Sequence, residues 1–159
     1  MTFRIAAFIA AIFLITPCFA HEQIVGHWIG TARVVHLWAY GKTFQVALDV
    51  HRNGSVTGKL GAAKLIDGHW RTDRPSDAKR TKNRDWMDYM ITGRLSGMVI
   101  PADHIAAANV FIPLDTEGGK LQGGVNTHGT THRTFFGTDQ MGIMSCDLTL
   151  ERFPTARRG

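Results

Sequence analysis

The sequence is poor in cysteine, proline and charged residues. Its 159 residues include two cysteines, too few for a disulfide-rich scaffold. Five prolines, 19% charged residues and 44% hydrophobic residues exclude a disordered or collagen-like chain. This length fits one domain and is short for two separate cores. We therefore expect a single globular domain that depends on a buried core rather than on cross-links.

The usual signatures of an active site are also missing. The sequence has no phosphate-binding loop, no dinucleotide-binding glycine motif and no nucleophile elbow. Asp85, Asp88 and Asp103 lie near predicted turns and are not spaced as a general acid/base pair. Cys146 falls on the inward side of a predicted strand, where we interpret it as a small buried apolar residue rather than a reactive thiolate. We predict that the protein is not an enzyme and holds no cofactor.

The eight histidines do not form a recognisable metal motif. His128 and His132 are close together if the segment is helical, but roughly 13 Å apart on a strand. Their setting of glycine and threonine indicates a loop, and no cysteine or carboxylate pair accompanies them. We predict no metal site, although a turn could still bring these two side chains together.

Residues 1–20 differ from the rest of the chain. They contain one charged residue, Arg4, followed by an apolar run, a helix-breaking Pro17 and the small residue Ala20. This order is typical of a secretory signal peptide. About eleven apolar residues make a helix of roughly 16 Å, too short to cross a membrane. We expect cleavage after Ala20, which leaves one exported domain over residues 21–159, periplasmic or extracellular.

Cys18 leaves a second interpretation of this leader open. The segment Ile15-Thr16-Pro17-Cys18 resembles a lipoprotein box, in which the cysteine is lipidated and becomes the first mature residue. Proline directly before the cysteine departs from that pattern. The alternative is therefore an exported domain anchored to lipid through Cys18.

Period-two alternation dominates the chain after residue 20. Phe44, Val46, Leu48 and Val50 alternate with more polar neighbours, as in a strand that is buried on one face. Asn53-Gly54 then supplies the positive φ angles of a tight hairpin turn. Strands are also predicted over residues 24–38, 56–60, 63–70, 86–96, 109–115, 120–127 and 144–153. Residues 101–108 are the one helix-compatible segment. The pattern predicts an all-β fold, an up-and-down antiparallel β-barrel of about eight strands.

Glycines recur on the predicted inner face of three strands, at Gly58, Gly93 and Gly123. Repeated inward glycine is typical of the sharp coiling that closes a small barrel. The alternative is that the missing side chains leave interior room for a ligand.

Gly26-His27-Trp28 at the start of the first predicted strand, together with Arg152 near the end of the last, resembles the lipocalin and wider calycin superfamily, which includes the avidins. The resemblance implies a closed barrel in which the Trp28 indole packs at one end and Arg152 lies across it in a cation–π contact. It covers the architecture of most of the chain but only three motif residues. The chain also lacks the helix expected after the last strand, and the biotin-binding residues of avidins do not carry over.

The predicted barrel suggests that the protein binds a small, mainly apolar ligand. If the first strand stays regular, His36 and Trp38 share the inward face with Trp28 and lie toward the open end. The alternative for His36 is a histidine at a strand end beside a core tryptophan. The residues predicted to bind the ligand are His36, Trp38, Phe44, Val46 and Leu95.

A second hypothesis is a protein-interaction or inhibitor module with a packed barrel. Residues 71–84 form a predicted exposed loop with a strong basic excess. Its cations, the candidates for an anionic macromolecular partner, are Arg71, Arg74, Lys79, Arg80, Lys82 and Arg84. Nucleic acid is not predicted, because no aromatic residues are interleaved with these charges. The polar outward positions of the strands also argue against an integral membrane barrel.

Overall fold

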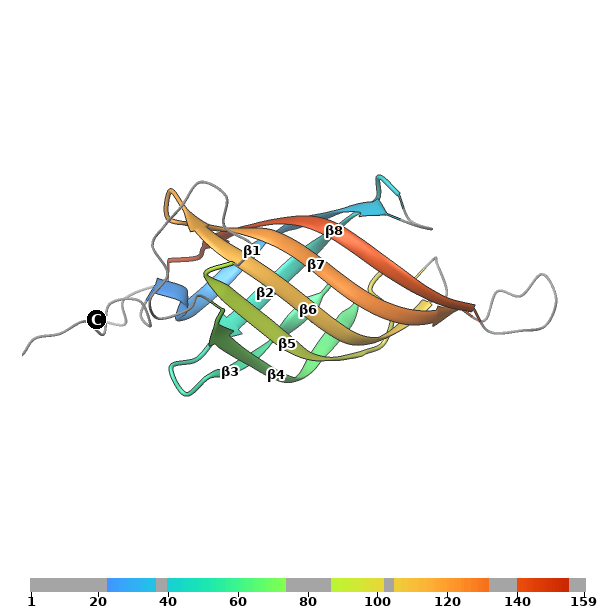
Figure 1. Ribbon diagram of the computed structural model, residues 1–159, viewed down its shortest axis with the longest axis horizontal. Helices are drawn as coiled ribbons and strands as arrows, with labels where there is room; N and C mark the ends of the chain where they lie inside the picture. Colours follow the sequence, from blue (N-terminus) through green and yellow to red (C-terminus); the bar gives the residue numbers. More distant parts are fainter. Residues whose placement is uncertain (1–22, 37–39, 74–86, 102–104, 132–139, 155–159) are drawn as a thin grey trace, which may run out of the picture.

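The chain forms eight strands that close into an antiparallel barrel (Figure 1). The computed structural model describes residues 23–36, 40–73, 87–101, 105–131 and 140–154. The strands are β1 (Gly26–His36), β2 (Thr43–Val50), β3 (Ser55–Leu60), β4 (Ala63–Thr72), β5 (Tyr89–Ser96), β6 (Ile105–Glu117), β7 (Lys120–Thr131) and β8 (Gln140–Arg152). Each strand pairs with the next, and β8 pairs with β1. The predicted all-β, up-and-down barrel of eight strands is confirmed.

The turn at Asn53-Gly54 joins β2 and β3 into a hairpin. Asn53 and Gly54 occupy the turn between β2 and β3, where Gly54 has a φ of 89° and the Asn53 side chain accepts the Ser55 N–H at 3.0 Å. β2 and β3 then pair from Val50 opposite Val56 onward. The hairpin predicted at Asn53-Gly54 is therefore confirmed. The tight type I′ turn predicted for it is wrong, because that turn needs a positive φ at both central residues and only Gly54 has one, in a four-residue connection between Val50 and Ser55.

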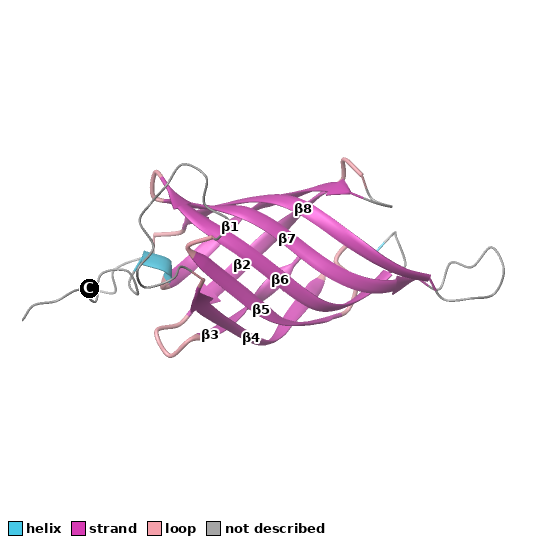
Figure 2. Cartoon of the chain, viewed as in Figure 1, coloured by secondary structure: helices cyan, strands magenta, loops and turns pink. Residues whose placement is uncertain are grey.

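Figure 2 shows that strands make up most of the described chain, with a short helical turn at Gln23 and Ile24 before β1. The helix-compatible interpretation of residues 101–108 is wrong for residues 105–108, which belong to β6. Ala107 pairs there with Gly129 of β7. A short segment has little helical stability of its own, so the hydrogen-bond ladder of the neighbouring strand decides its conformation.

The strands differ in length, and this makes the two ends of the barrel unequal. β6, β7 and β8 contain 13, 12 and 13 residues, whereas β3 contains 6. The long strands extend past β3 at the end opposite the start of β1 (Figure 1). We call this the open end, and the end that holds the start of β1 the closed end.

The middle of the barrel is filled with apolar side chains. Along each strand, buried residues alternate with more exposed ones, as expected for a sheet with one face inside. The inward side chains with an exposed fraction of 0% include Leu48, Leu60, Ile91, Val110, Ile112 and Val125. A cavity large enough for water would leave part of its wall exposed, so these side chains pack against one another. Eight strands enclose an interior that side chains can fill in this way.

The inward glycines lie where neighbouring strands approach too closely for a side chain. A Cβ atom at Gly123 would lie 1.9 Å from the carbonyl oxygen of Pro113, and one at Gly58 would lie 2.1 Å from that of Ala47. At Gly93 the nearest atom would be Leu65 Cδ1, at 2.8 Å. Glycine is therefore present because the coiled neighbouring strand or its side chain occupies this space, which supports the coiling interpretation over interior room.

Gly123 and its neighbour Gly124 provide a matched test of this close approach. Gly123→Ala should lower the free energy of unfolding by about 2–3 kcal/mol, because the new methyl group overlaps the β6 backbone. At Gly124 a new Cβ would lie 3.2 Å from the Cys146 carbonyl oxygen, a tight contact that a shift of a few tenths of an ångström relieves, so Gly124→Ala should cost less, under about 1 kcal/mol. Urea denaturation followed by tryptophan fluorescence measures both, and equal losses would contradict the interpretation.

Candidate functional site

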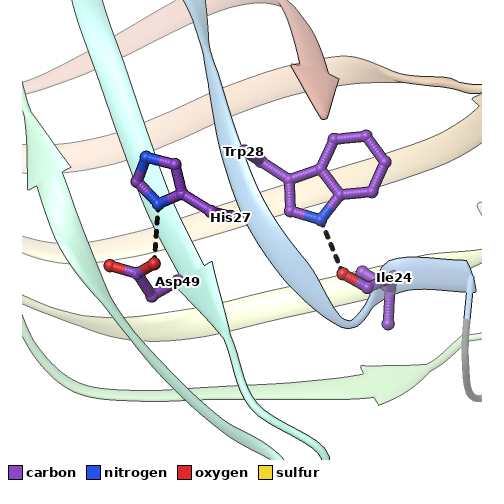
Figure 3. A network of polar contacts seen from close by, with 4 residues as sticks. All are labelled: Ile24, His27, Trp28 and Asp49. Atoms are coloured by element: carbon purple, nitrogen blue, oxygen red, sulfur yellow. Dashed lines mark hydrogen bonds and ion pairs between the residues drawn. The ribbon is translucent and has the colours of Figure 1, made fainter. Parts of the chain in front are cut away.

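The closed end is plugged by Trp28. The indole is buried, and its Nε1 donates a hydrogen bond of 2.6 Å to the carbonyl oxygen of Ile24 in the helical turn (Figure 3). Trp28 also lies opposite Arg152 in the pairing of β1 with β8. The Arg152 Cζ atom sits 4.8 Å from the centroid of the indole ring, and the guanidinium donates to the carbonyl oxygen of Gln23. The predicted packing of Arg152 over Trp28 is confirmed.

Gly26 gives the backbone the conformation that this arrangement needs. Its φ of 147° is a conformation that residues with a side chain rarely adopt. An added Cβ would be in ordinary van der Waals contact with the Arg152 guanidinium, at 3.7 Å, so the backbone conformation and not the space requires glycine. The glycine before the tryptophan therefore lets the chain enter β1 beneath the arginine.

A histidine–aspartate pair lies on the outer face at the same end. His27 Nδ1 and Asp49 Oδ1 are 2.6 Å apart, and the two residues are direct cross-strand partners on β1 and β2 (Figure 3). The His27 ring also meets the Phe153 ring edge-on at 5.7 Å. Sequence reasoning missed this pair, because its signal is the register between two strands and not a spacing within one. The pair joins the end of β2 to the start of β1.

Asp88 has a structural role that its position near a turn did not reveal. Its carboxylate accepts the Thr116 backbone N–H at 3.1 Å, while its own N–H donates to the Asp115 carboxylate at 3.0 Å. These two bonds tie the segment before β5 to the end of β6. Asp85 and Asp103 lie outside the described residues.

Two of the predicted ligand residues end the inward faces of their strands at the open end. Phe44 begins the inward face of β2 and Leu95 ends that of β5, and each has an exposed fraction of 7%. Val46 is one inward position deeper and is fully enclosed. Val99 follows β5, is buried with the core, and accepts the Ala62 N–H at 3.2 Å across the turn between β3 and β4. Of the predicted ligand residues, Phe44 and Leu95 thus lie at the mouth, with Val46 just below.

The other two predicted ligand residues are not brought into this group. His36 is exposed at the end of β1, where the pairing with β8 shifts register between Val34 and His36. The irregularity interrupts the alternation on which the inward placement of His36 depended. Trp38 lies outside the described residues.

The basic segment is described only at its beginning. Arg71 lies exposed in β4, and its guanidinium is 3.9 Å from the Asp73 carboxylate. The remaining predicted cations, Arg74, Lys79, Arg80, Lys82 and Arg84, lie outside the described residues.

His128 lies in β7 and not in a loop, so that expectation is wrong. β7 pairs with β6 on one side and with β8 on the other at this position, where His128 lies opposite Asn109 and Ile143. The exposed His128 ring meets the Phe111 ring edge-on at 6.2 Å. His132 lies outside the described residues. In the described part of the chain, no group of three or more histidine, cysteine or acidic residues is arranged to hold a metal ion.

Together these features define the class of protein as an eight-stranded closed antiparallel β-barrel, consistent with a lipocalin-like fold. No family model, no curated protein and no solved structure matches the chain. Over residues 23–154, apart from the gaps given above, no helix has the length and apolar character needed to span a bilayer.

Arg152 tests the plug at the closed end. Arg152→Ala removes the contact with the Trp28 ring and the bond to Gln23, so the free energy of unfolding should fall by roughly 1 kcal/mol. Lys59→Ala is the control, because Lys59 is an exposed cation on the outer face of β3. It should leave stability unchanged in the same urea titration. If the two variants lose the same amount, Arg152 does not stabilise the plug.

Cys146 provides a pH-dependent test of the filled interior. Burial, and then the neighbouring Asp147 carboxylate, raises the pKa of the Cys146 thiol to about 12. The native thiol should therefore resist iodoacetamide at pH 8.5 and react fully in guanidinium, as read by mass spectrometry of the peptide that contains it. Folding raises the pKa of the Cys146 thiol, so the unfolded thiol ionises first as the pH rises. The free energy of unfolding therefore has its full contribution from Cys146 below pH ~8.5 and declines as the pH rises toward the folded pKa. Rapid labelling of the native thiol would contradict this assignment.

Proposed function

We propose that this protein is an exported, lipocalin-like barrel of the calycin type that binds a small, mainly apolar molecule at its open end. The observation that carries the proposal is the position of Phe44 and Leu95 at the mouth, where each has an exposed fraction of 7%, against 0% for side chains of the middle such as Leu48 and Ile112. Apolar side chains at the mouth of a barrel favour apolar ligands.

The rest of the barrel narrows this proposal to a shallow site. Trp28, Ile24 and Arg152 occupy the closed end, and the strand backbones fill the space beside the inward glycines. Among the described residues, these groups leave little room for a ligand at the closed end or in the middle. The predicted residues Phe44, Val46 and Leu95 are those that a ligand entering from the open end would meet first.

The Trp28–Arg152 contact supports the calycin assignment, because it reproduces the pairing that the resemblance implies. We base export to the periplasm or cell exterior on the signal peptide predicted over residues 1–20, and lipid attachment through Cys18 is its alternative.

A second candidate is the packed interaction module. The exposed fraction of 0% among side chains of the middle favours it, because a filled barrel acts through its outer surface and loops. Its partner would be an anionic macromolecule at the basic residues of the 71–84 segment.

A blocking substitution at the mouth distinguishes the two candidates. The uncharged probe N-phenyl-1-naphthylamine should bind the wild type with enhanced fluorescence, and Leu95→Trp should weaken its binding at least tenfold because the indole fills the mouth. Ser96→Trp, at the adjacent exposed position, should bind normally. Circular dichroism verifies folding, and Phe44→Ala is a second variant that should alter affinity by enlarging the mouth.

Each outcome of this binding experiment supports one candidate function or contradicts it. A wild type that binds neither this probe nor a co-purifying molecule in native mass spectrometry would overturn the ligand proposal and favour the interaction module. Equal weakening by both tryptophan variants would place the probe elsewhere on the barrel.

A further inference from the structure

Thr127 is the one buried polar residue among the residues that the structure describes, with an exposed fraction of 2%. It continues the inward face of β7 after Leu121 and Val125. Its direct partners are Val110 on β6 and Met144 on β8, both of which are buried and apolar. A single hydroxyl therefore lies in an apolar row, on the long strands that form the open end.

The Thr127 hydroxyl is poorly satisfied within the protein. Its contact is with the carbonyl oxygen of His128 at 3.5 Å, longer than the 2.5–3.0 Å of a good O–H···O bond. One residue away, on the outer face of the same two strands, the Ser145 hydroxyl donates to the Asn126 side chain at 2.9 Å. A buried hydroxyl without a good partner is unfavourable, and valine would fill the same volume without that penalty.

We propose that the Thr127 hydroxyl is the polar contact of the ligand site, and that the ligand is an uncharged molecule with an apolar body and one hydrogen-bonding group. This inference rests on the proposed function, since it names what binds at the same open end. The apolar body would lie against the mouth residues Phe44 and Leu95 and against Met144, the partner of Thr127 on β8. The polar group, a hydroxyl or carbonyl, would reach inward to β7. Because Thr127 keeps an exposed fraction of 2%, the side chains at the mouth would move apart to admit it.

The absence of buried charge in the described part of the barrel favours an uncharged group at Thr127. Thr127 is the only polar or charged residue among those buried there, so a carboxylate or ammonium would enter without a counter-ion. An unpaired ion in such surroundings is strongly unfavourable. A neutral alcohol or ketone group meets this requirement at Thr127, whereas an ionised group does not.

A pair of ligands that differ only in the polar group tests this contact. 2-Naphthol and 2-methylnaphthalene exchange a hydroxyl for a methyl group, as Thr127→Val does in the protein. Displacement of N-phenyl-1-naphthylamine measures the affinity of each. The preference for 2-naphthol over 2-methylnaphthalene should fall roughly threefold to tenfold in Thr127→Val, the effect of one net hydrogen bond. Thr149→Val, an exposed threonine on the outer face of β8, should leave the preference unchanged.

The outcomes distinguish this inference from the proposed function. If both naphthalenes displace the probe and Thr127→Val leaves their ratio unchanged, the polar contact is wrong and the apolar site stands. If the wild type binds neither the probe nor either naphthalene, the proposed function itself is wrong. Should Thr127→Val fail to fold, Thr127→Ser and Thr127→Ala replace it. A preference kept in the serine variant and lost in the alanine variant supports the contact, and one kept in both overturns it.

Discussion

The pairing of the first strand with the last is the constraint on which the whole structure depends. β1 and β8 join over eight residue pairs from Trp28–Arg152 to His36–Ser145, and without this seam the sheet has two open edges and no enclosed core. The seam is also the pairing most distant in sequence, so its loop-closure entropy is the largest in the fold. The contact of Arg152 with the Trp28 ring, and the Phe153 N–H that donates to His27, hold the seam at one end.

Much of this fold could be predicted from the sequence, because its signals are local. Alternation along residues 43–51 gives the buried face of β2 directly, and Asn53-Gly54 gives the turn that follows it. The Trp28–Arg152 contact could be predicted through a resemblance, although the two residues are far apart in the sequence. In each case a pattern within a few residues, or a known pairing, carries the information.

The rest depends on register, which a single sequence does not display. The register shift between β1 and β8 after Val34 moves His36 out of the predicted alternation, and the residue types at positions 34–36 do not predict this shift. The lengths of β6, β7 and β8 follow from mutual pairing, so a histidine amid glycine and threonine becomes part of a strand. The inward glycines could not be interpreted from position alone, because only the distance to the neighbouring backbone separates close packing from open space.

The position of the seam has a consequence for how this domain can be joined to other structures. β1 begins and β8 ends side by side at the closed end, as the bond from Arg152 to Gln23 shows (Figure 1). A tether or fusion partner joined directly before β1 or after β8 would therefore sit beneath the plug, and the mouth would point away from it. The same geometry makes the domain a natural candidate for circular permutation, since a short linker could connect the two ends without crossing the barrel.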